Sequence, residues 1–183
     1  MNILIFVYTM ISIISLNWTV FTSDEGAFSV LTPGEMQYEV KQIPTSTGEI
    51  SLHNYTYRAT DTIEHVFLYS ITHYALPLDE LDPDSTDINV QDLFDETLSS
   101  IASRIRGEIL YSQEETLENF PARISRIKYN EGQYSLKNKI VLANDQIYLI
   151  EVFSTYDKGA EFKIRKFINS FNILDPTLDA VEE

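Results

Sequence analysis

The chain has 183 residues, of which 44% are apolar and 22% charged, and this is enough hydrophobic material for one ordinary domain. Its 13 basic and 28 acidic residues give a net charge of −15, which argues against free nucleic acid and anionic membrane surfaces as partners, because both demand clustered positive charge. The absence of cysteine excludes a disulfide framework, a thiolate zinc site and a cysteine nucleophile.

The N-terminus carries an uncharged apolar run over residues 3–16, followed by polar and aromatic residues and then by Asp24 and Glu25. The run has the length of a signal-peptide core, although no basic residue precedes it. Residues 3–21 also approach the roughly 20 residues that span a bilayer, so an uncleaved anchor is the second interpretation and a buried strand the third. We expect residues 1–22 to be a signal peptide or N-terminal anchor, and the domain to be exported: periplasmic, extracellular or envelope-anchored.

From Ala27 onward, short runs rich in Val, Ile, Tyr, Phe and Thr alternate with turn residues, a pattern typical of strands and hairpins. The predicted strands of the first half cover residues 27–31, 36–43, 50–57 and 64–74. We expect the second to be half-buried and the fourth to be central and covered on both faces. We expect the first to be an edge strand, open to dimerisation or strand addition.

An acidic loop over residues 75–90 separates these strands from a predicted helix. Asp87 or Asn89 is the expected cap, and the helix ends at Arg106. Its apolar side chains recur every three to four residues and form one stripe: Leu93, Phe94, Leu98, Ile101, Ala102 and Ile105.

The second half predicts a four-strand antiparallel meander over residues 108–116, 122–129, 134–143 and 146–155. Gly159 or Asp157 then opens a closing helix to about Ser170, with four apolar residues facing the core: Phe162, Phe167, Ile168 and Phe171. Residues 175–183 are expected to be an acidic flexible tail. The prediction is therefore one α+β domain over residues 23–174, an antiparallel sheet of about seven to eight strands covered by two helices.

Five segments together resemble the PsbP-like superfamily, and more closely the small exported bacterial domains of that fold: residues 28–40, 48–57, 118–127, 144–154 and 166–174. The resemblance implies an α/β/α sandwich. Members of the superfamily are mostly non-enzymatic and include an extrinsic photosystem subunit, a Ran-GTPase release factor, periplasmic DcrB-like proteins and Eag-type chaperones. The resemblance therefore favours binding over catalysis, and it supplies no common set of functional residues.

Two groups of side chains raise the question of a metal site. In one interpretation, His53 and His65 face one another across a predicted hairpin and form a metal site with Glu64. The preferred interpretation is that all three histidines, including His73, are partly exposed strand residues. Eight carboxylates without an intervening basic residue suggest calcium: Asp79, Glu80, Asp82, Asp84, Asp87, Asp92, Asp95 and Glu96. This stretch of residues 79–96 contains no glycine and has Pro83 where a ligand turn would start, so a solvated loop is preferred.

Four basic residues of the closing helix, Lys158, Lys163, Arg165 and Lys166, either dock an anionic partner or solvate an exposed face, and solvation is preferred. No nucleophile motif or phosphate-binding loop occurs, and Ser99, Ser100 and Ser103 lie on the predicted helix. We therefore predict no catalytic, cofactor-binding or metal-binding residue.

These observations predict a non-enzymatic exported binding or accessory module of a bacterial envelope. Its partner is a protein or small ligand, and membrane attachment is expected only through the N-terminal segment. The alternatives are a chaperone or carrier for an apolar segment and a hydrolase with an unrecognised site.

Overall fold

The computed structural model describes residues 18–44, 48–59, 65–76, 89–156 and 160–174. Several predictions fall outside these ranges: the N-terminal apolar run, the C-terminal tail, Glu64, Lys158 and the calcium candidates between residues 79 and 87. The signal peptide, the tail and the calcium site therefore stay predictions.

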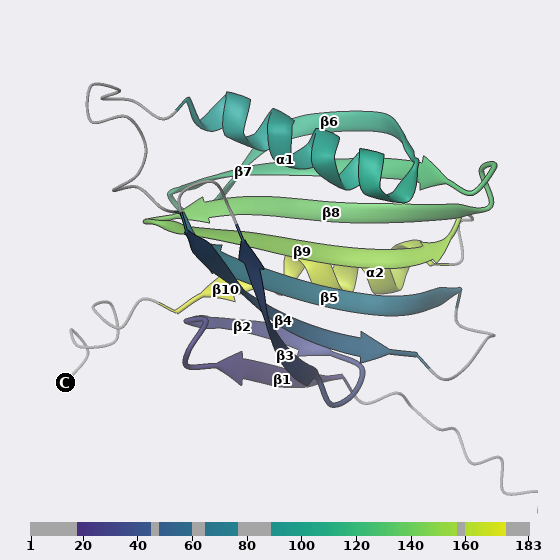
Figure 1. Cartoon of the computed structure of the whole chain (residues 1–183). Coiled ribbons are helices and arrows are strands. Elements are labelled where there is room, and N and C mark those ends of the chain that lie inside the picture. The colour runs from purple at the N-terminus through teal and green to yellow at the C-terminus, as the bar shows by residue number, and fades with distance from the viewer. Residues whose placement is uncertain (1–17, 45–47, 60–64, 77–88, 157–159, 175–183) are drawn as a thin grey trace, which may run out of the picture.

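Seven antiparallel strands form the main sheet in the order β3-β4-β5-β9-β8-β7-β6 (Figure 1). In chain order they are β3 (Gln37–Pro44), β4 (Glu49–Arg58), β5 (Val66–Ala75), β6 (Glu108–Leu117), β7 (Phe120–Tyr129), β8 (Tyr134–Ala143) and β9 (Gln146–Thr155). The predicted strands and the meander are confirmed, and β5 is central, between β4 and β9.

The edge strand β3 differs from its prediction. All eight of its residues are exposed, whereas alternating hydrophobicity predicted a half-buried strand. The reason is its position: β3 pairs only with β4 at the outer edge of the sheet, so its apolar Tyr38, Val40 and Ile43 lie beyond the packed core.

A second, three-stranded sheet has the order β1-β2-β10 and joins the two ends of the domain. Its strands are β1 (Thr19–Ser23), β2 (Phe28–Thr32) and β10 (Asn172–Ile173). Because β1 and β10 both pair with β2, the prediction of an edge strand over residues 27–31 is wrong. The sequence gives no separate signal for the two-residue strand β10, which is too short to show alternation.

The boundary predicted after residue 22 falls inside β1. All five residues of β1 pair with β2, from Thr19 opposite Thr32 to Ser23 opposite Phe28. Trp18 and Phe21 pack against the core. The folded unit therefore includes residues 18–22, which the sequence alone places in the N-terminal segment.

Helix α1 (Val90–Ile105) matches its prediction closely. The Asn89 side chain accepts hydrogen bonds from the backbone N–H groups of Gln91 at 3.0 Å and Asp92 at 3.4 Å, which caps the first turn. Arg106 ends the helix in the left-handed conformation, with φ 52°. The predicted stripe faces the sheet, with four fully buried members: Phe94, Leu98, Ile101 and Ala102.

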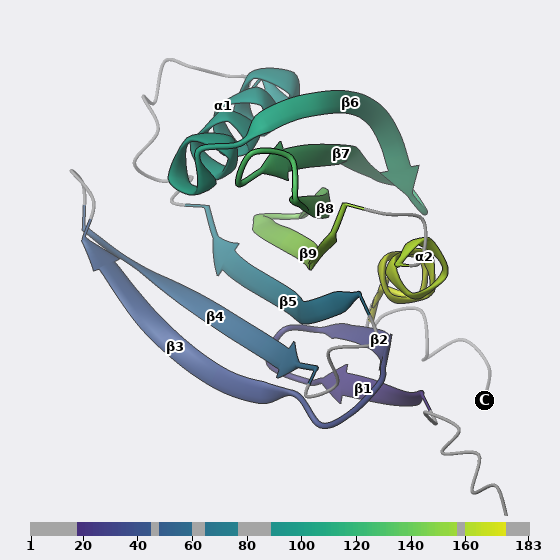
Figure 2. The same cartoon turned by 90° about the vertical axis from the view of Figure 1, so that its right-hand side faces the viewer.

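Helix α2 (Glu161–Asn169) lies on the opposite face of the main sheet, beside the small sheet (Figure 2). It buries Ile164, Phe167 and Ile168, as its pattern predicts in part. Phe162, however, is 68% exposed, because a residue two positions before Ile164 lies on the opposite side of a helix. Its assignment to the core was wrong.

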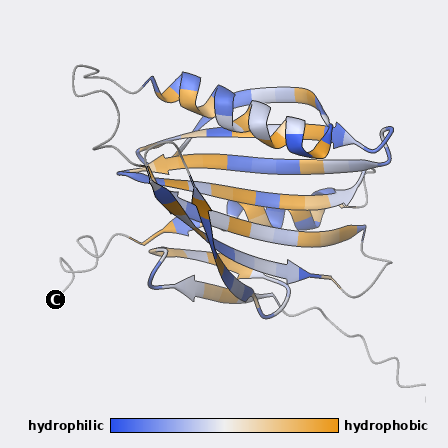
Figure 3. Ribbon diagram, in the orientation of Figure 1, coloured by the Kyte–Doolittle hydropathy of each residue, from blue (hydrophilic) through white to orange (hydrophobic). Residues whose placement is uncertain are grey.

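The layers are therefore α1, the main sheet, and then α2 with the small sheet, an α+β architecture with a hydrophobic core on each face of the main sheet. The central strands β5 and β9 carry long hydrophobic stretches, as expected for strands covered on both faces, whereas β8 is hydrophobic at its end and hydrophilic over residues 137–139 (Figure 3). No helix among the described residues has the length and apolar character needed to cross a membrane.

Candidate functional site

A pocket of about 480 Å³ opens between the turn that joins β1 to β2 and the main sheet. Its walls come from that turn (residues 25–27), the first half of β4, the end of β5 and the beginning of β9. The floor is built from side chains on one face of the sheet, because residues directly opposite on neighbouring strands point to the same side.

Aromatic and imidazole rings form a ladder across this face. In the strand register, His53 on β4 lies opposite His73 on β5, and His73 lies opposite Tyr148 on β9. The two imidazoles stack with centroids 4.7 Å apart and planes 17° apart, and His73 stacks on Tyr148 at 5.8 Å. Tyr38 on β3 stacks on His53 at 6.1 Å, so the ring ladder of Tyr38, His53, His73 and Tyr148 crosses four strands.

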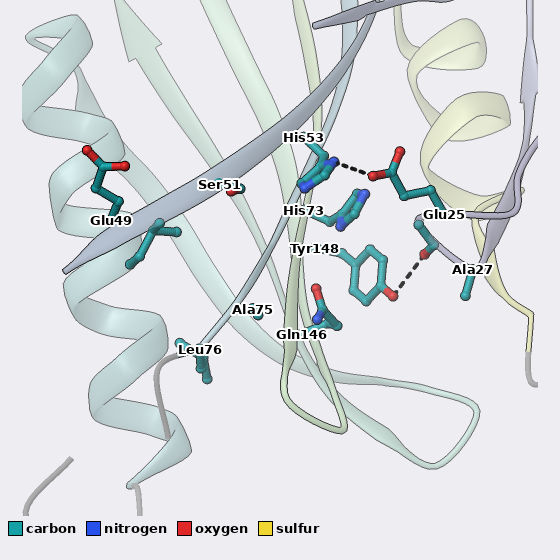
Figure 4. Close-up of a pocket in the computed structure, with 12 residues that line it drawn as sticks. Glu25, Ala27, Glu49, Ser51, His53, His73, Ala75, Leu76, Gln146 and Tyr148 are labelled. Atoms are coloured by element: carbon teal, nitrogen blue, oxygen red, sulfur yellow. Dashed lines mark hydrogen bonds and ion pairs between the residues drawn. The ribbon is translucent and has the colours of Figure 1, made fainter. Parts of the chain in front are cut away.

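The outer end of the ring ladder meets the carboxylate of Glu25, from the turn (Figure 4). The Nδ1 atom of His53 lies 3.2 Å from Glu25 Oε1, and the Tyr38 hydroxyl donates to Glu25 Oε2 at 2.7 Å. The same hydroxyl lies 2.8 Å from His53 Nδ1. Hydrogen bonding to Glu25 raises the pKa of Tyr38 to about 12, so the phenol stays protonated.

The inner end of the ring ladder is buried. His73 is only 4% exposed, and this burial lowers its pKa. The neighbouring His53 acts in the same direction, while the Gln146 side chain opposes the shift. Among the described residues, Nε2 of His73 has no hydrogen-bond partner of normal geometry. The ring is therefore a neutral imidazole at neutral pH.

The turn lies directly on the ring ladder because residue 26 is glycine. The Tyr148 hydroxyl donates to the carbonyl oxygen of Gly26 at 3.0 Å. A Cβ atom at position 26 would lie 2.9 Å from His73 Nε2 and 2.7 Å from a ring carbon of Phe28, closer than real contacts allow. Ser23 holds the turn from its other end by accepting a hydrogen bond from the Gly26 N–H at 3.0 Å.

The histidine pairing differs from the one predicted. His73, not His65, lies opposite His53, because the register of β4 with β5 leaves His65 just before β5. His65 Nδ1 instead lies 3.3 Å from the Thr155 hydroxyl. No group of three or more His, Asp or Glu side chains that could hold a metal ion occurs in the described ranges. The alternation in β4 and β5 places each histidine on a face, but only the register brings the two rings together.

The lining residues include the rings of His53, His73 and Tyr148, the carboxylates of Glu25 and Glu49, and polar groups, which are the elements of a recognition site. Ser51 brings a hydroxyl to the wall, but it donates to the Gln42 side chain on β3 at 3.0 Å and not to a histidine. A serine nucleophile needs a base within hydrogen-bond reach, and Ser51 is engaged elsewhere. The geometry therefore suits binding better than acyl transfer.

Comparison with known proteins shows the fold. No protein-family model matches the chain, and no curated protein matches it. Among solved structures, cyanobacterial PsbP (CyanoP) from Synechocystis sp. PCC 6803 is similar with a TM-score of 0.56 and 8% sequence identity, over 88% of this chain and 95% of that one. A protein of unknown function, PA94 from Pseudomonas aeruginosa, gives a TM-score of 0.38 and 12% identity over 75% and 83% of the two chains, too low a score to carry an argument. The chain has a PsbP-like fold.

Proposed function

We propose that this protein is a non-enzymatic, exported binding module, and that its pocket takes an organic cation, either a small molecule or the lysine or arginine side chain of a partner protein. The observation that carries the proposal is the ring ladder ending at Glu25. Aromatic faces attract cations through the ring quadrupole, and a carboxylate beside them supplies the opposite charge.

The size and charge of the site support this ligand class. The pocket volume of about 480 Å³ lies in the range of ordinary ligand pockets, roughly 300–1,000 Å³. Residues 1–100, which supply β1 to β5, contain two basic and 15 acidic residues, a net charge of −13. Two of these acidic residues, Glu25 and Glu49, line the pocket itself, and carboxylates at this position attract a cationic ligand.

The proposal is tested by calorimetric titration of the purified chain with arginine amide, lysine amide and a quaternary ammonium salt. Sodium acetate is the control for nonspecific salt and anion effects. We expect at least one cation to bind. Glu25→Gln should weaken that binding by about tenfold or more, because it removes a charged partner worth roughly 1.5–3 kcal/mol. His65→Asn is the matched control, since His65 lies outside the pocket and asparagine tolerates its positive φ of 59°.

Absence of binding by all three cations, or equal loss in both variants, would sink the organic-cation proposal. Hydrolysis of ester, peptide or phosphate substrates that is abolished by His53→Asn would replace the binding module with a hydrolase, the alternative that places His53 in a catalytic role.

A second candidate function, a carrier for an apolar segment, is favoured by β3. Its edge position and its exposed Tyr38, Val40 and Ile43 resemble the sites at which extended peptides add to a sheet. An uncharged apolar peptide that binds the wild type and is lost with Val40→Ser, while Glu25→Gln has no effect, would favour this function over cation binding.

A further inference from the structure

The outward side of α2 combines an exposed aromatic ring with basic side chains. Phe162 is exposed, and together with Arg165, Lys166 and Asn169 it lines a shallow hollow of about 460 Å³. We call these four residues the α2 face. The buried side of the helix, around Ile164 and Phe167, packs on the core, so the helix is amphipathic with a basic outer side.

The positive charge of the α2 face is not cancelled by its own helix. The acidic residue of the first turn, Glu161, is already engaged by two cations from the main sheet: Arg126 at 3.4 Å and Lys137 at 3.7 Å. Arg165 and Lys166 therefore contribute their charge to a local basic surface in a strongly acidic protein. Residues 101–183, which include this helix, contain 11 basic and 13 acidic residues, against two and 15 in residues 1–100.

The chain enters the fold beside this surface. The Lys166 ammonium group lies 4.7 Å from the centroid of the Trp18 ring, and Trp18 directly precedes β1. β1 begins on the α2 side of the small sheet (Figure 2). The apolar run of residues 3–16 ends two positions before Trp18 in the sequence, so any membrane that receives this run lies within a few residues of the α2 face.

From these contacts we infer that the α2 face docks on an anionic lipid bilayer, with Arg165 and Lys166 at the headgroups, Phe162 inserted between them and Trp18 at the interface. Tryptophan side chains are enriched at the membrane–water interface. Membrane attachment through a single apolar segment becomes more stable when a basic surface also contacts anionic lipid. The net charge of −15 does not prevent it, because 11 of the 13 basic residues lie in residues 101–183, which carry a net charge of only −2, and salt screens charges more than about 8–10 Å away. This surface is separate from the pocket and does not depend on its ligand.

The test uses the full chain and vesicles of phosphatidylcholine, alone or with about one-third phosphatidylglycerol. The apolar run gives the same background on both, so the measured quantity is the ratio of partition coefficients, anionic to neutral. Arg165→Gln with Lys166→Gln should lower this ratio by about thirtyfold, since each basic residue near an anionic surface contributes about 1 kcal/mol. Lys41→Gln with Lys128→Gln, an equal charge change on β3 and β7, is the control and should leave the ratio nearly unchanged.

A second readout reports orientation. Trp18 is the only tryptophan of the chain, so Trp18→Phe gives a silent background. In it, Phe162→Trp places an indole on the α2 face, and Phe67→Trp places one at a partly exposed site on β5 that packs with Phe153 towards the opposite face of the main sheet. Brominated lipids in anionic vesicles should quench the first indole and spare the second. Equal quenching, quenching of the second alone, or an unchanged ratio in the Arg165/Lys166 variant would overturn the inference.

Discussion

Glu151 is a carboxylate that the fold has buried among the strands. It lies on β9, opposite Asn138 of β8 and Ser70 of β5, and is 5% exposed. Burial raises its pKa to about 7, and Arg104, whose guanidinium nitrogen lies 3.9 Å from Oε1, opposes the shift only in part. A buried charge without a close partner costs free energy, and a proton removes that cost.

This burial predicts a pH-dependent stability. The folded pKa of about 7 exceeds the ordinary value of 4.5, so the contribution of Glu151 is fully present below pH 4.5 and is lost as the pH rises to 7. Glu151→Gln should remove the loss and stabilise the protein by on the order of 3 kcal/mol at pH 8, with little change at pH 4.5. Urea denaturation at the two pH values measures this. Glu114→Gln, on the exposed strand β6, is the control; an equal gain at both pH values would contradict the assignment to Glu151.

Gly26 shows how one missing side chain positions the pocket. Because a Cβ atom there would collide with His73 and Phe28, Gly26→Ala should displace the turn from the ring ladder and destabilise the fold by about 1–3 kcal/mol. The substitution should also lower the affinity for any cation that binds the wild-type protein, because Glu25 is the adjacent residue and would move with the turn. Guanidinium denaturation and the same calorimetric titration measure the two effects. A Gly26→Ala variant with wild-type stability would show that the turn can move to accommodate a Cβ atom without a loss of stability, which would contradict this prediction.

At the scale of elements, β1 decides where the folded unit begins. Trp18 packs edge-on against Tyr69 at 5.7 Å, and Phe21 packs against Tyr55 at 5.6 Å. Each large apolar side chain contributes roughly 1.5–3 kcal/mol when fully buried, and the pairing of β1 with β2 is lost in addition if the strand is removed.

Trp18 and Phe21 are only partly buried, so a chain that starts at residue 23 should melt several degrees below one that starts at residue 18, given roughly 2–4 °C per kcal/mol for a domain of this size. Calorimetry of the two chains, with the full chain as reference, makes the comparison. Equal melting temperatures would mean that β1 contributes nothing to stability. If the shorter chain melts lower, as we expect, a signal peptidase site compatible with this fold must precede Trp18 rather than follow residue 22.

The elements also show how far sequence patterns reach. The stripe in α1 and the cap at Asn89 are local features, and local physics places them correctly. The strands of the meander follow from alternation and from turn residues such as Asn144, whose positive φ of 57° suits the hairpin. The exposure of β3 could not be predicted, because it depends on which neighbours a face meets and not on the residues' own polarity. The exposure of Phe162, in contrast, follows from helical periodicity, which places it opposite Ile164.

At the scale of the whole molecule, the candidate site could not be predicted from the sequence, because it is formed by residues that are far apart in the chain. Glu25, His53, His73 and Tyr148 come from three strands and a turn, and their meeting depends on the register of β4 with β5 and of β5 with β9. Composition indicates a sheet protein with many aromatic residues but cannot identify which of them share a face. The PsbP-like fold, in contrast, was predicted from the resemblance of five segments to that superfamily, and the structural similarity to cyanobacterial PsbP confirms it.

The small sheet joins the beginning of the domain to its end, and this sets the order in which the chain can fold. The Leu31 N–H donates to the Ser170 hydroxyl at 2.9 Å across a separation of 139 residues, and the Leu174 N–H donates to the Ala27 carbonyl at 2.8 Å. β1 and β2 are synthesised first, yet they lack β10 and α2 until the last residues are made. Phe21 and Phe28 of the nascent hairpin therefore stay exposed through most of synthesis. During this interval they form an apolar surface to which a chaperone would bind.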